Sequence, residues 1–129
     1  MDKTLDTVLL MLEGSTITLE IFCVTLALSL PLGLFAALGR LSRFRLLSRL
    51  LEIYIWIMRG TPLMLQLLFV YFALPMVGIL LPDIVAALLA FVLNYAAYFA
   101  EIFRSGIQAI PRGQFEAARA LGMSAPLTM

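Results

Sequence analysis

The chain has 129 residues, of which 63% are hydrophobic, and its mean hydropathy is +1.04. An ordinary soluble domain is about 45–50% apolar, so this composition indicates a protein of the lipid bilayer. The sequence has no histidine, one cysteine and a single lysine, Lys3, which excludes a transition-metal site, a Cys–His nucleophile and a phosphate-binding loop. We therefore expect no enzyme and no bound cofactor, and any ATP that the protein uses must bind to another chain.

Three runs without charged residues predict membrane-spanning helices: residues 21–39, 62–82 and 84–100. A helix rises 1.5 Å per residue and the hydrocarbon core is roughly 30 Å thick, so each run can cross it, the third if Glu101 lies near an interface. The predicted fold is an all-α, polytopic membrane bundle with spans at about 15–39, 62–81 and 84–103.

The second span begins with a helix break, Arg59-Gly60-Thr61-Pro62. Glycine and the position before proline both disfavour the continuation of a helix. A new helix can start here, with Thr61 as its N-cap and Pro62 in its first turn. Residues 50–58 would then form a separate short helix or a segment that lies in the membrane plane; the alternative is one kinked helix.

The arginines define the orientation. They fall in two groups separated by two spans, the first between spans one and two and the second after span three: Arg40, Arg43, Arg45, Arg49 and Arg59, then Arg104, Arg112 and Arg119. Because positive charge is enriched on the cytoplasmic side, we expect both groups inside and the acidic N-terminal segment outside.

Few polar residues accompany the spans, and four are candidates for a substrate pathway: Gln66, Asn94, Tyr98 and Glu101. Asn94 and Tyr98 lie four residues apart on one helical face, where they can bond to a polar solute or, equally, to neighbouring helices. Glu101 can act in gating or simply pair with Arg104 three residues on. Thr25 and Ser29 also lie within the first span.

The segment GQFEAARALGMS, residues 113–124, predicts a short cytoplasmic helix at about 112–122. Pro111 and Gly113 open it, Glu116 and Arg119 can pair, and Gly122 can close it in a left-handed conformation. Small residues and one aromatic, Phe115, Ala118 and Gly122, line up as a narrow ridge that suits a groove on another protein. The alternative is a helix that lies on the membrane or on its own loops.

These segments resemble a known family. Glu116, Ala117, Ala118 and Gly122 match the EAA motif of the membrane subunits of bacterial ATP-binding cassette (ABC) importers. NYAAYFAEIFRSGIQAIPRGQ (residues 94–114), RGTPLMLQLLFVYFALP (59–75) and the opening with Gly14, Thr18 and Leu19 are similar to the permeases for polar amino acids.

The resemblance implies a permease with five spans in the bacterial inner membrane, paired with an identical or sister subunit. ATP and magnesium would bind to separate cytoplasmic ATPases, and a binding protein outside would deliver the solute; nucleic acid is not a partner. The motif helix would be the coupling helix, contacting the ATPase through Glu116, Ala117, Ala118, Arg119 and Gly122.

The family pattern continues into two further spans that do not follow in this sequence, which suggests a fragment or a truncated product. Two other functions stay open: an ion-coupled carrier that uses Glu20 or Glu101, and a small membrane subunit that does not transport.

Overall fold

The computed structural model describes residues 3–128, and this part of the chain is helical, without strands. The helices are α1 (Lys3–Leu41), α2 (Arg45–Gly60), α3 (Leu63–Met76), α4 (Asp83–Ala109), α5 (Arg112–Ala120) and α6 (Ala125–Thr128). The all-α fold is confirmed. α1 and α4 are long and apolar enough to cross a membrane, and a third crossing is reached if the bent pair α2 and α3 counts as one span.

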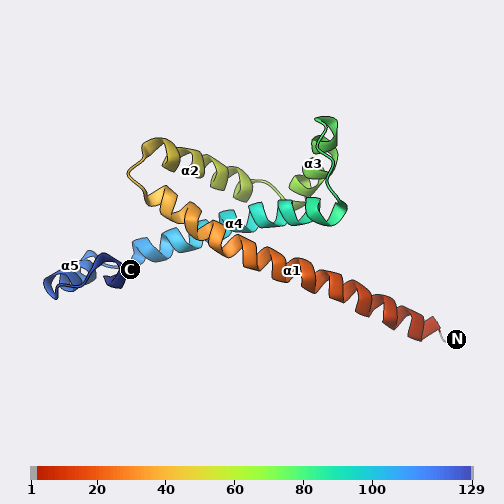
Figure 1. Cartoon of the computed structure of the whole chain (residues 1–129), viewed down its shortest axis with the longest axis horizontal. Helices are drawn as coiled ribbons and strands as arrows, with labels where there is room; N and C mark the ends of the chain where they lie inside the picture. The colour runs from red at the N-terminus through yellow and green to blue at the C-terminus, as the bar shows by residue number, and fades with distance from the viewer. Residues whose placement is uncertain (1–2, 129) are drawn as a thin grey trace.

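The centre of the molecule is the crossing of α1 and α4 (Figure 1). Small side chains allow the backbones of the two helices to approach closely. The small residues that line the contact are Gly33, Ala36, Ala37, Ala96, Ala97 and Ala100. A Cβ atom added at Gly33 would lie 2.6 Å from the Cβ atom of Phe99 and 3.0 Å from the carbonyl oxygen of Ala96. Close packing of small residues is how membrane helices associate where lipid removes the hydrophobic driving force.

The second predicted span is not one continuous helix. α2 and α3 meet at a bend of 105°, at the expected break. α3 has 14 residues and ends at Met76 rather than near residue 81, which makes it roughly 21 Å long and too short to cross the hydrocarbon alone. The helix before the break is therefore separate from α3, as predicted, but it extends from Arg45 to Gly60 rather than over residues 50–58. The single kinked helix does not form.

The predicted cap at the break is wrong in detail. Thr61 is the C-cap of α2, and Pro62 rather than Thr61 is the N-cap of α3. The carbonyl of Pro62 accepts the first helical bonds, from the amides of Leu65 (3.0 Å) and Gln66 (3.3 Å). The Thr61 hydroxyl instead donates to the carbonyl of Ile57 at 2.8 Å, because the side chain belongs to the preceding turn.

α1 and α4 run in the same direction, so the α1–α2 turn and α5 lie toward the same end of the molecule (Figure 1). The expected spans, 15–39 and 84–103, lie within these helices, but both helices are longer. α1 has 39 residues and is roughly 58 Å long at 1.5 Å per residue. Its first 18 described residues, Lys3 to Glu20, are exposed in this chain.

Candidate functional site

The motif helix is α5, and it extends beyond the end of α4 (Figure 1). Two residues, Ile110 and Pro111, connect the helices in extended conformations. The carbonyl of Pro111 accepts a hydrogen bond of 3.0 Å from the amide of Gln114. α5 ends at Ala120, two residues before the predicted end at Gly122, so the glycine lies just outside the helix.

Gly122 turns the chain at the end of α5 in the predicted left-handed conformation, with φ +73°. The amide of Met123 donates to the carbonyl of Ala118 and the amide of Gly122 donates to that of Arg119, both at 3.0 Å. This pair of bonds is the Schellman arrangement, which satisfies carbonyls that the helix end leaves free. Other residues rarely adopt this conformation because their Cβ atom is strained there.

The exposed face of α5 differs from the predicted ridge. Ala118 is only 9% exposed within the chain and Phe115 is half-buried, whereas Glu116, Ala117, Arg119 and Gly122 are exposed. Glu116 and Arg119 also form no ion pair; within residues 3–128 the ion pairs are Arg40–Glu52 and Glu101–Arg104. Both charges of the motif are therefore free for another molecule.

A second cluster of predicted site residues holds the break between α2 and α3. The side-chain amide of Asn94, which is 4% exposed on α4, donates to the carbonyl of Met58 and to Oε1 of Gln66, both at 3.0 Å. Gln66 Nε2 donates to the same carbonyl at 3.0 Å and to the hydroxyl of Thr61 at 2.7 Å. Of the two roles left open for Asn94, the structure shows bonding to neighbouring helices.

The side-chain amides of Asn94 and Gln66 provide hydrogen-bond donors that the break between α2 and α3 requires. The last carbonyls of a helix have no partner in the helix, and in an apolar surrounding an unpaired carbonyl is costly. Asn94 and Gln66 supply donors to Met58 at the end of α2. The Tyr54 hydroxyl, which the sequence did not single out, adds a bond from α2 to the carbonyl of Leu93 on α4.

Tyr98 lies beside the break and is 41% exposed. The guanidinium carbon of Arg59 lies 5.5 Å from the centre of its ring, a distance at which a cation is attracted to an aromatic face. A Cβ atom added at Gly60 would have no other atom within 4 Å. Tyr98 thus contacts the break through Arg59 rather than joining the bonds of Asn94.

Glu101 pairs with Arg104 one turn along α4. The Arg104 Nε atom donates to Oε2 of Glu101 at 3.0 Å, and its NH2 group bonds to Oε1. Arg104 also donates to the side-chain oxygen of Gln108. The carboxylate is therefore neutralised within its own helix. Glu20, the other acidic candidate, is exposed on α1.

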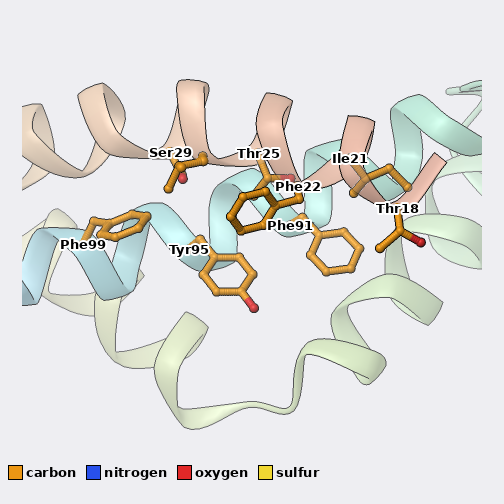
Figure 2. Close-up of a pocket in the computed structure, with 9 residues that line it drawn as sticks. Thr18, Ile21, Phe22, Thr25, Ser29, Phe91, Tyr95 and Phe99 are labelled. Atoms are coloured by element: carbon orange, nitrogen blue, oxygen red, sulfur yellow. The ribbon is translucent and has the colours of Figure 1, made fainter. Parts of the chain in front are cut away.

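A groove of about 410 Å³ lies between α1 and α4 (Figure 2). Its nine lining residues include no charged side chain: Thr18, Ile21, Phe22, Thr25, Leu26 and Ser29 from α1, and Phe91, Tyr95 and Phe99 from α4. The hydroxyls of Thr25 and Ser29 are buried without a hydrogen-bond partner. The prediction of site residues missed this groove; the spacing of Thr18, Thr25 and Ser29 along one helical face was the available signal.

Comparison with known proteins places these features in a family. Residues 29–129 match the family described as binding-protein-dependent transport system inner membrane component. The chain is 45% identical over 121 residues to the arginine transport system permease protein ArtQ of Bacillus subtilis (strain 168), covering 93% of this chain and 55% of that protein. It is 39% identical over 123 residues to the putative glutamine transport system permease protein GlnP of Rickettsia bellii (strain RML369-C), covering 95% and 56%.

A solved structure has the same fold. A crystal structure described as an amino acid ABC transporter with histidines superposes with a TM-score of 0.79 at 37% identity, covering 94% of this chain and 60% of that one. The molecule is thus a helical membrane protein of the permease class. It belongs to the family of binding-protein-dependent transport system inner membrane components, and it spans about half the length of the curated relatives it matches.

Proposed function

We propose that this chain is a permease subunit of an ATP-driven importer for polar amino acids, and that α5 couples it to a separate ATPase. The observation that carries the proposal is the placement of α5: a helix of nine residues with an E-A-A motif, beyond the end of α4, with Glu116, Ala117 and Arg119 exposed. A helix with free charges and a small exposed residue between them suits a cleft on a partner protein.

The connection between α5 and α4 supports coupling. Only Ile110 and Pro111 separate the helices, and proline restricts φ at the junction. A displacement of α5 would therefore move α4, which contacts α1, α2 and α3. ATP and magnesium would be held by the ATPase, and this chain would transmit its closure to the membrane helices.

The proposed orientation in the membrane and the proposed partners follow from the positions of the α1–α2 turn and α5. The arginine-rich α1–α2 turn and α5 lie toward one end of the molecule, and the positive-inside rule makes that end cytoplasmic and the N-terminus external. A second permease subunit, identical or sister, and an external solute-binding protein complete the proposed importer in the bacterial inner membrane. The names of the relatives, for arginine and glutamine transport, support a polar amino acid as solute.

The substrate pathway is a narrower part of the proposal. The side-chain amides of Gln66 and Asn94 form hydrogen bonds at the helix break. We therefore propose that these residues maintain the shape of the pathway and do not contact the solute directly. The partly exposed Tyr98 is the better candidate for contact. The ion-coupled alternative gains no support from Glu101, because this carboxylate is paired with Arg104.

The test is a bulky residue on the exposed face of α5. The chain is expressed with the ATPase, partner permease and binding protein of its own transporter, and ATP hydrolysis stimulated by the loaded binding protein is measured in proteoliposomes. We expect Ala117→Trp to abolish the stimulation, since the tryptophan obstructs the cleft. The matched control is Ala125→Trp, the same change at an exposed position of α6, and it should retain the stimulation.

Co-purification of the ATPase gives a second readout. Ala117→Trp should insert into the membrane normally but recover less ATPase. Full stimulation and full recovery with Ala117→Trp would show that α5 is not the coupling helix. Uptake that survives ATP depletion but collapses with an uncoupler would show that the protein is an ion-coupled carrier, contrary to the proposal.

A further inference from the structure

The turn between α1 and α2 carries a positive surface that the proposed coupling function does not use. It consists of Arg43, Arg45 and Arg49, which we call the arginine surface. All three side chains are exposed, and none takes part in the ion pairs formed within residues 3–128. The surface therefore presents three free guanidinium groups within seven positions of sequence.

The acidic residue near this surface is already occupied. Glu52 on α2 forms an ion pair of 3.3 Å with Arg40 at the end of α1. The hydroxyl of Ser48 also donates to the carbonyl of Arg40 at 2.8 Å. These two contacts join the helices and leave the neighbouring arginines without an internal counter-charge.

The exposed face of α2 changes character along its length. Arg45 and Arg49 are one turn apart, and Ile53 and Trp56 continue the same face at helical spacing. Ile53 is 53% exposed and Trp56 is 76% exposed. The opposite face is used for packing, since Ile55 is 4% exposed and joins the core with Ala36 and Ala97. The exposed face of α2 is therefore positively charged near the start of the helix and apolar farther along it.

We propose that the arginine surface binds the headgroups of anionic phospholipids. Arginine presents a planar fork of donors that matches phosphate oxygens, and clusters of basic residues beside a membrane helix attract anionic lipid. Trp56 and the exposed Phe44, 77% accessible, supply the aromatic side chains that favour the headgroup level. Charge complementarity and the adjoining apolar face together select a lipid, whose headgroup and acyl chains match both parts.

Trp56 is the only tryptophan of the chain and so reports on its own lipid neighbours. The chain is reconstituted in vesicles of phosphatidylcholine with a minor fraction of brominated phosphatidylglycerol, and in vesicles where the brominated lipid is phosphatidylcholine. Bromine quenches tryptophan fluorescence on contact. We expect stronger quenching by the brominated phosphatidylglycerol, and a preference that falls as salt rises.

Substitution then tests the arginines. The triple variant Arg43→Gln, Arg45→Gln, Arg49→Gln should reduce the preference at least several-fold, because arginines beside a membrane helix attract anionic lipid. The single variant Arg49→Gln should weaken it, while its matched control Arg112→Gln, at the exposed first residue of α5, should not.

Two outcomes would overturn the proposal. The first is equal quenching by both brominated lipids in the unaltered chain. The second is a preference that the triple variant retains. If the triple variant retains it but recovers less co-expressed ATPase, the arginine surface serves a protein rather than lipid. The quenching does not depend on transport, so its failure is distinct from failure of the proposed importer function.

Discussion

Asn94 and Gln66 are 28 positions apart in sequence, and their side-chain amides meet at 3.0 Å beside the break between α2 and α3. Both also donate to the carbonyl of Met58. The pair joins three helices at one point, because Asn94 belongs to α4, Gln66 to α3 and Met58 to α2. A bend of 105° is thus held by side chains of α3 and α4 that bond to a backbone carbonyl of α2.

This relationship predicts coupling between the two amides. Asn94→Ala and Gln66→Ala should each lower the free energy of unfolding by about 1–3 kcal/mol, since each leaves a buried polar group without its partner. The double variant should cost less than the sum of the two, because the bond they share is lost only once. Unfolding in detergent, followed by circular dichroism, measures all three; strictly additive losses would contradict the shared bond.

The α1–α4 crossing predicts a steric limit at Gly33. In Gly33→Ala the new Cβ atom would lie 2.6 Å from that of Phe99, so the helices must separate, at a cost of about 1–3 kcal/mol. Gly14→Ala is the matched control, since nothing lies within 4 Å of its added Cβ atom; it should be neutral or stabilise by up to about 1 kcal/mol through helix propensity. Equal thermal stability of the two variants would disprove the close contact.

The end of α5 predicts a conformational effect at Gly122. Gly122→Ala meets no atom within 4 Å, but φ is +73°, so the substitution should cost about 1–2 kcal/mol through backbone strain alone. The bond from Met123 to Ala118 would open more often. Hydrogen exchange at the Met123 amide should accelerate, whereas Gly113→Ala, at an unobstructed position without positive φ, should leave it unchanged. Unaltered protection in Gly122→Ala would refute this account.

The Glu101–Arg104 pair predicts a modest effect of Glu101→Gln. Both side chains are about one fifth exposed, and pairs of this kind on one helix contribute on the order of 0.5 kcal/mol. Glutamine keeps an acceptor for Arg104, so thermal stability should change little. In the proposed importer, uptake driven by ATP should persist. Loss of uptake with intact folding would instead assign the carboxylate a direct role in translocation.

Much of this protein could be read from local sequence. Charge-free runs identify the two long helices, and Arg59-Gly60-Thr61-Pro62 locates the break, because apolar length and glycine or proline act on the backbone within a few residues. Gly122 is likewise predictable as a helix end, since its left-handed conformation is a local property. The motif around Glu116 indicates the class of protein, which the family comparison confirms.

The contacts of the polar residues, in contrast, depend on the tertiary structure. In sequence, Asn94 could face solute or another helix; folding brings it within 3.0 Å of the carbonyl of Met58, 36 positions away. The sequence also could not predict that Ala118 is buried, or that Glu116 and Arg119 form no ion pair in the described chain. Local propensity acts over a few residues, whereas partners and burial depend on which helices cross and at what angle, and that is determined by packing along the whole chain.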